Sequence, residues 1–227
     1  MTLSPKPAKQ RTEVRQASLV EAALRMAAER SPADITTAEL ASAVGISQGA
    51  VFKHFANKEA IWLAVLDWTT DTLMTRLQAT AGHAPPAAKA IRDTAPKGTA
   101  VTTSPSALPA LQAVFLAHVD FVIDYPGVPR VIFQELQSPG ETALKSRVRG
   151  LMLRYRQLLM QLLQQAEQQR TIGADTDLQA AVVLFIGAVQ GLVMQAMISG
   201  DVAAMAPQAP GVFAIFEHGL LAGRTLN

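Results

Sequence analysis

The residues best suited to chemistry lie between positions 36 and 58, where small, polar and basic side chains alternate with apolar ones. Gln48 can pair with adenine through two hydrogen bonds, and Gly49 and Ala50 would let a helix approach base edges or a thymine methyl group. The basic residues that follow suit phosphate contacts. The residues expected to contact DNA are Thr36, Thr37, Ser47, Gln48, Gly49, Ala50, Phe52, Lys53, His54 and Lys58.

Two short helices must position these side chains. Thr36 and Glu39 have the spacing of a capping box, which predicts the start of a helix directly after Thr36. Gly45 suits the left-handed position that ends such a helix, and Ser47 is a residue type that caps the next one, expected over 48–55. The pattern therefore predicts a helix-turn-helix, in which the second helix enters the major groove.

Other interpretations of this segment are weaker. An ordinary helical hairpin would not need the basic residues that follow. Residues 45–49 also match Gly-x-Ser-x-Gly, the nucleophile elbow of hydrolases, but that elbow needs a strand before Ser47, and residues 38–44 favour a helix. The chain has no cysteine and its four histidines are widely spaced. We therefore expect no enzyme activity, no metal site and no cofactor.

The stretch TTAELASAVGISQGAVFKHFANKEAI resembles the DNA-binding region of the tetracycline-repressor (TetR) family of bacterial regulators, and the resemblance covers about residues 11–65. Val51 stands where Leu is commoner in that family. Phe52 stands where Tyr is usual, so a phenol-to-phosphate hydrogen bond would be missing here. The matching residues are Gly45, Ser47, Gly49, His54, Phe55, Lys58 and Glu59.

This resemblance implies a DNA-binding transcriptional regulator, in most cases a repressor. Such a protein would bind a near-palindromic operator on double-stranded DNA as a homodimer, and a small apolar or aromatic effector would release it. A ligand-independent DNA-binding or adaptor protein of the same fold is the alternative.

Helical periodicity along the whole chain predicts an all-α protein with two domains. Residues 1–10 form a basic arm, 11–56 the helix-turn-helix domain, and 57–227 a helical effector-binding and dimerisation domain. Within the second domain, 82–109 is rich in Pro, Ala and Thr and is expected to be a loop. Helices are expected near residues 11–30, 57–81, 111–125, 128–137, 141–170, 178–200 and 211–223.

The run 178–200 contains no charged residue and is long enough to cross a bilayer. Glutamines interrupt it, and no Lys/Arg cluster flanks it as an orientation signal. A helix buried by its own domain on one side and by a twin subunit on the other explains it better. With no signal peptide visible, we expect a cytoplasmic protein. The expected dimer interface comprises Leu184, Gly187, Ala188, Gly191, Phe213, Phe216 and Leu220.

An effector pocket is implied by the family resemblance. Mostly apolar walls with a few polar groups are typical of small-molecule sites. The residues that could line such a pocket are Phe115, His118, Phe121, Val122, Phe133, Met152, Tyr155, Phe185, Gln190 and Met194.

Overall fold

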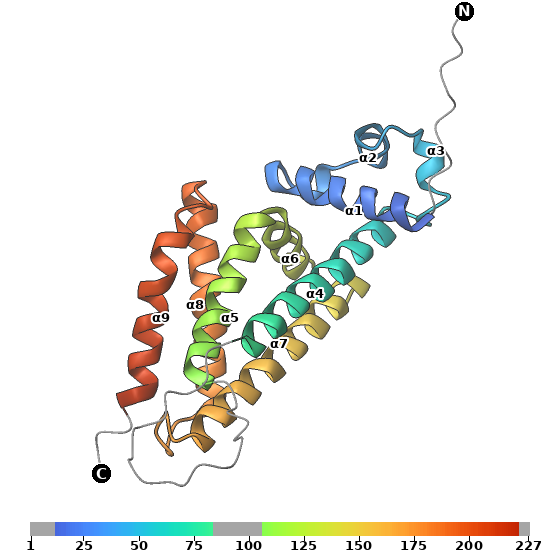
Figure 1. Cartoon of the computed structure of the whole chain (residues 1–227). Coiled ribbons are helices and arrows are strands. Elements are labelled where there is room, and N and C mark those ends of the chain that lie inside the picture. The colour runs from blue at the N-terminus through green and yellow to red at the C-terminus, as the bar shows by residue number, and fades with distance from the viewer. Residues whose placement is uncertain (1–11, 84–105, 223–227) are drawn as a thin grey trace, which may run out of the picture. The chain divides into compact units, whose positions relative to one another are not determined.

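The computed structural model describes residues 12–83 and 106–222, and within these ranges all regular secondary structure is helical. This confirms the all-α prediction. The predicted arm 1–10 and most of the predicted loop 82–109 lie outside the described residues. The helices are α1 (Thr12–Glu29), α2 (Thr37–Ala43), α3 (Gln48–Val51), α4 (Lys58–Gly82), α5 (Ala107–Asp124), α6 (Gly127–Gln137), α7 (Ala143–Gln168), α8 (Leu178–Ser199) and α9 (Met205–Ala222), with a 3-10 turn, η1, over Pro32–Asp34 (Figure 1).

The chain divides into two compact units, and each unit combines two segments that are separate in the sequence. The first unit joins the described residues up to Thr69 to Tyr125–Val148, and the second joins Thr70–Asp124 to the described residues from Arg149 onward. The predicted boundary at residue 56 does not coincide with either end of these units. The division into a DNA-binding domain, 11–56, and an effector-binding domain, 57–227, stays a prediction.

In the first unit, α1 packs against α6 as well as against α2. The apolar face of α1 is buried through Leu19, Ala23 and Ala27, at the spacing expected of a helix with one inward face. On α6, Gly127 lies so close to α1 that an added Cβ would overlap the carbonyl oxygen of Leu24. The same Cβ would lie 3.1 Å from the Cβ of Ala27, so the contact requires a residue without a side chain.

In the second unit, α5 packs against both α8 and α9, which lie side by side (Figure 1). The Phe185 ring meets the rings of Phe115 and Phe213 edge to face, with centroids 5.3 and 6.4 Å apart. Phe216 approaches Phe185 in the same way, at 5.4 Å. Edge-to-face contacts of this kind add to the free energy of simple burial, so these rings form the centre of the unit.

Several helix boundaries differ from the sequence prediction. α5 begins at Ala107, not near residue 111, so the end of the predicted loop 82–109 is helical. α9 begins at Met205, not near residue 211, because Pro207 falls in its first turn, where a missing N–H costs nothing. Pro210 lies inside the helix. α7 ends at Gln168, and Arg170 adopts a left-handed φ of 54°, a position usually occupied by glycine.

Two helices, Ala107–Asp124 and Leu178–Ser199, are long and apolar enough to cross a membrane. Core helices of soluble proteins pass the same test. Both carry buried faces within the second unit, including Phe115 on α5 and Phe185 on α8. Packing within the protein therefore accounts for much of their apolar character.

The approach of α6 to α1 predicts a large difference between two glycine substitutions. Gly127→Ala should lower the free energy of unfolding by roughly 2–3 kcal/mol, because the methyl group would push two helix backbones apart. Gly150→Ala, in α7, is the control: its added Cβ meets no atom within 4 Å, and it should raise the free energy by roughly 0.5–1 kcal/mol through helix propensity. Urea unfolding of both variants measures the difference, and equal effects would contradict it.

Candidate DNA-reading and effector sites

The capping box at the start of α2 forms as predicted. The backbone N–H of Glu39 donates to Thr36 Oγ1 at 3.2 Å, and the backbone N–H of Thr36 donates to Glu39 Oε2 at 2.8 Å. Arg30 adds an ion pair to Glu39 Oε1 at 2.8 Å. The Thr36 hydrogen bonds, with Arg30 beside them, lower the pKa of Glu39 to about 2. The carboxylate is therefore ionised at neutral pH, and it fixes the N-terminus of α2.

The turn after α2 also matches the prediction. Gly45 has a φ of 69°, which an L-residue with a side chain adopts only under strain. Arg15 on α1 donates to the carbonyl oxygen of Val44 at 3.0 Å, which holds the end of α2 against α1. Because α2 and not a strand precedes Ser47, the Gly-x-Ser-x-Gly segment lacks the geometry of a nucleophile elbow.

The second helix is shorter than predicted. α3 spans only Gln48–Val51, and hydrogen-bonded turns continue the chain to Phe55, whose N–H donates to Val51 O at 3.0 Å. The Ser47 hydroxyl makes no capping hydrogen bond, contrary to the sequence analysis. Ser47 lies in the N-cap position by its backbone alone.

The face of α3 proposed to meet bases is exposed. Ser47, Gln48 and Gly49 are all exposed, and a Cβ at Gly49 would meet no atom within 4 Å. Gln48 Nε2 donates to Thr37 Oγ1 at 3.0 Å, so these two residues form one polar surface across α2 and α3. Phe52, in the position where the family resemblance expects Tyr, is 49% exposed.

The basic residues differ in how freely their side chains could contact a DNA phosphate. Lys53 is exposed, whereas Lys58 is half-buried and donates to the carbonyl oxygen of Ala33 at 2.7 Å. His54 Nδ1 is buried without a hydrogen-bond partner in the described chain, so any phosphate contact from this ring must use Nε2. Gln16, which is not among the predicted DNA contacts, holds His54 by donating from Nε2 to the His54 carbonyl oxygen at 2.9 Å. Nothing in the sequence around Gln16 pointed to that role.

Four of the residues predicted to line an effector pocket lie together in an aromatic cluster in the second unit. His118 Nδ1 lies 2.9 Å from the Tyr155 hydroxyl. The Phe185 ring packs edge to face against Tyr155 and also against Phe115. Phe115, Tyr155 and Phe185 have no exposed surface. Burial lowers the pKa of His118 to about 4 and raises the pKa of Tyr155, so both side chains are neutral at physiological pH.

The remaining pocket candidates lie elsewhere. Phe121 and Val122 are buried on α5, and the Arg76 guanidinium lies 5.8 Å from the centre of the Phe121 ring. Met152 is half-buried on α7, and Phe133 is half-buried on α6 in the first unit. The structure exposes Gln190 and Met194 on the outer face of α8, away from the aromatic cluster.

The interface prediction needs a correction on α9. Phe213, Phe216 and Leu220 are buried within their own chain, at 0, 4 and 5% exposure, so they cannot contact a partner without opening the core. The exposed apolar side chain of α9 is Ile215, at 77%. On α8, Ala188 is half-buried and the other three residues of that prediction are exposed. The exposed small and apolar residues of the two helices, called the dimer face in the proposal below, are Leu184, Gly187, Gly191, Met194 and Ile198 on α8 with Gly211, Ile215 and Gly219 on α9.

Comparison with known proteins gives matches at both ends of the chain. Residues 19–65 match the model for bacterial regulatory proteins of the tetR family, and residues 137–209 match the tetracyclin repressor-like C-terminal domain. A nucleoid occlusion factor SlmA from Alteromonas mediterranea is 26% identical over 172 residues, which are 74% of this chain and 77% of that protein.

Two solved structures share the fold. The fatty acid degradation regulator FadR from Bacillus halodurans has a TM-score of 0.73 at 16% identity, covering 96% of this chain and 98% of that one. The transcriptional regulator FadR from Bacillus subtilis, in complex with stearoyl-CoA, has a TM-score of 0.70 at 16% identity, covering 89% and 98%.

The lowered pKa of His118 predicts a loss of stability in acid. Below about pH 6.5 the unfolded chain takes up a proton on this imidazole, whereas the folded chain does not until about pH 4. The free energy of unfolding should therefore fall by roughly 2–3 kcal/mol as the pH is lowered through this window. His118→Gln, which can keep the hydrogen bond to Tyr155 but cannot titrate, should remove that part of the pH slope. Urea unfolding between pH 4 and 7, at one protein concentration, measures both slopes; identical slopes would contradict the assignment.

Proposed function

Given that the chain belongs to the tetR family of bacterial regulatory proteins, we propose that it is a ligand-responsive regulator that represses transcription from a near-palindromic operator. The observation that carries this proposal is the polar surface formed by the exposed Gln48 and Gly49 with the half-buried Thr37, held by a capped α2 and a glycine turn. Two copies would place their α3 helices about one duplex turn, roughly 34 Å, apart.

The helix-turn-helix of each subunit, residues 36–58, is called the reading head below. Within it, different residues would contact bases and phosphates. Gln48 offers an amide for adenine, and Gly49 and Ala50 leave room for a base edge. Lys53 is the first choice for a phosphate contact because it is exposed, whereas Lys58 is engaged with Ala33. With Phe52 unable to donate a hydrogen bond, the phosphate contacts depend more on Lys53 and on the N-terminus of α2.

The effector that suits the second unit is a neutral apolar or aromatic group. The aromatic cluster around His118 and Tyr155 offers apolar walls with one polar pair, and the pKa of His118 keeps that pair uncharged. A charged group placed there would lose its hydration without a counter-charge. The stearoyl-CoA of the Bacillus subtilis FadR carries an acyl chain of the required apolar character. The cluster is closed here, so an effector would have to part α5 from α7 and α8.

We expect α6 to transmit the effect of effector binding to the DNA-binding helices. In the first unit, Gly127 holds α6 against α1, and Gln134 Oε1 accepts hydrogen bonds from Ser31 Oγ at 2.9 Å and from the Ala33 N–H at 3.3 Å. Movement of α6 would therefore displace both α1 and η1. An effector can drive this change only as far as it binds one arrangement more tightly than the other.

A second copy of the chain is the proposed cover for the dimer face. A Cβ added at Gly187 or Gly191 would meet no atom of the described residues within 4 Å, so space for a neighbouring helix remains above both glycines. Glycines at this spacing let two helices approach closely. Leu184, Ile198 and Ile215, each more than half exposed, would be removed from water by the same contact.

The alternative function is DNA binding that needs no effector. The closed aromatic cluster and the relative named as a nucleoid occlusion factor favour this alternative to a small extent. A titration of operator binding against candidate apolar effectors separates the two functions, because only the ligand-responsive regulator would release its DNA. Regulators of this family are generally not enzymes, and we assign this chain no catalytic role and a cytoplasmic location.

Base and phosphate contacts should respond differently to substitution. Gln48→Ala should change which operator sequence is preferred, whereas Lys53→Ala should weaken binding to all sequences and reduce the salt slope by about one per reading head. Binding to a randomised operator library, read at several salt concentrations, measures both effects. A changed base preference for Lys53→Ala with an unaltered salt slope would contradict this division of roles.

The dimer face predicts a matched pair of leucine substitutions. Gly191→Leu should convert the dimer to monomer, because the side chain would fill the space needed by the partner helix. Gly150→Leu, at an exposed glycine of α7 whose Cβ also meets no atom within 4 Å, should leave the dimer intact. Sedimentation velocity distinguishes these states, and an intact Gly191→Leu dimer would show that the partner sits elsewhere.

A further inference from the structure

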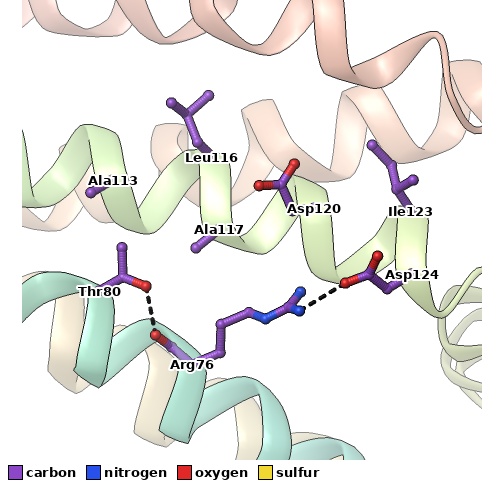
Figure 2. A pocket seen from close by; sticks show the side chains of 8 residues that line it. All are labelled: Arg76, Thr80, Ala113, Leu116, Ala117, Asp120, Ile123 and Asp124. Atoms are coloured by element: carbon purple, nitrogen blue, oxygen red, sulfur yellow. Dashed lines mark hydrogen bonds and ion pairs between the residues drawn. The ribbon is translucent and has the colours of Figure 1, made fainter.

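A groove on the outer side of α5 is separate from the aromatic cluster. Its volume is about 530 Å³, and all its lining residues belong to the second unit. Arg76 and Thr80 reach it from α4, beneath the alanines of α5 (Figure 2). The α5 residues that line it are Ala113, Leu116, Ala117, Asp120, Ile123 and Asp124.

Small side chains keep this groove open. Ala113 and Ala117 are four residues apart on α5, so they lie one above the other on the same helix face. Neither reaches far enough to fill the space toward α4. Leu116 and Ile123, both half-buried, supply larger apolar surface on either side of Asp120.

The charges in the groove do not balance. Arg76 Nη2 forms an ion pair with Asp124 Oδ2 at 2.7 Å. Its other terminal nitrogen, Nη1, is buried and makes no hydrogen bond to any described residue, and the guanidinium faces the Phe121 ring at 5.8 Å. Arg76 is thus held by Asp124 and Phe121. It forms no ion pair with Asp120, the other carboxylate of the groove.

Asp120 is the carboxylate that remains. It is exposed, and in the described part of the chain no basic residue forms an ion pair with it. An uncompensated carboxylate with apolar side chains on both sides is complementary to a molecule with a positive head and an apolar body. The volume of the groove lies within the range of small-molecule sites, 300–1,000 Å³.

We propose that the α4–α5 groove is a binding site for an amphipathic organic cation, such as an amine on a short apolar body. The ammonium group pairs with Asp120, and the apolar body lies against Ala113 and Ala117, on the side of α5 that faces α4 (Figure 2). This site is independent of the proposed neutral effector, because α5 presents His118 and Asp120 to different surroundings.

Three probes that differ only in the head group test the proposal: 4-phenylbutylamine, 4-phenylbutan-1-ol and 4-phenylbutyrate. Calorimetric titration of the full-length protein at low salt should give the amine a dissociation constant about three- to fivefold lower than the alcohol, the range expected of a partly exposed ion pair. The carboxylate should bind most weakly. Raising the salt concentration should remove most of the preference for the amine.

Substitutions locate the site. Asp120→Asn should make amine and alcohol bind equally, whereas Asp175→Asn, at another exposed aspartate, should preserve the three- to fivefold preference. Ala117→Leu should weaken the amine and the alcohol at least tenfold by filling the groove. Amine binding that survives both Asp120→Asn and Ala117→Leu, or tightest binding of 4-phenylbutyrate, would overturn the proposal. Operator binding, measured on the same variants, reports separately on the proposed repressor function.

Discussion

The contact between two helix backbones at Gly127 is the constraint on which the first unit depends. A side chain there would overlap the carbonyl oxygen of Leu24, so α6 reaches α1 only because one residue lacks a Cβ. This approach brings Gln134 within hydrogen-bonding distance of Ser31 and Ala33. The DNA-reading head is therefore part of the same compact unit as residues 125–148, which follow it by more than fifty positions in the sequence.

The second unit depends on burial of aromatic rings around one polar pair. Because burial removes water from around His118, its imidazole stays neutral where an exposed one would begin to titrate. The outer faces of the same helices have a different character. α5 carries Asp120 and Asp124 toward the groove, and α8 carries a glycine-centred apolar stripe. α5 thus packs into the core with one face and lines the proposed binding groove with another.

Local interactions were predictable from the sequence, and choices among helix faces were not. The capping box of Thr36 and Glu39 and the left-handed Gly45 depend on neighbours within a few residues, so residue type and spacing sufficed. Periodicity identified α9 as apolar but could not tell Phe213, in the core, from Ile215, on the surface, since an apolar helix has no polar face to orient it. The role of Gly127 depends on a helix a hundred residues away, so no pattern of neighbouring residues predicts it.

The hydrogen bond between Gln48 and Thr37 has a consequence for the entropy of recognition. A free glutamine side chain gives up rotamer freedom worth roughly 1–2 kcal/mol when it is fixed. Here Thr37 already restrains Gln48, with Nε2 and Oγ1 3.0 Å apart, so part of that loss has occurred before DNA arrives. The amide retains a second N–H and its oxygen, the donor and acceptor that adenine N7 and N6 require. The head therefore meets its operator with its reading side chain already ordered.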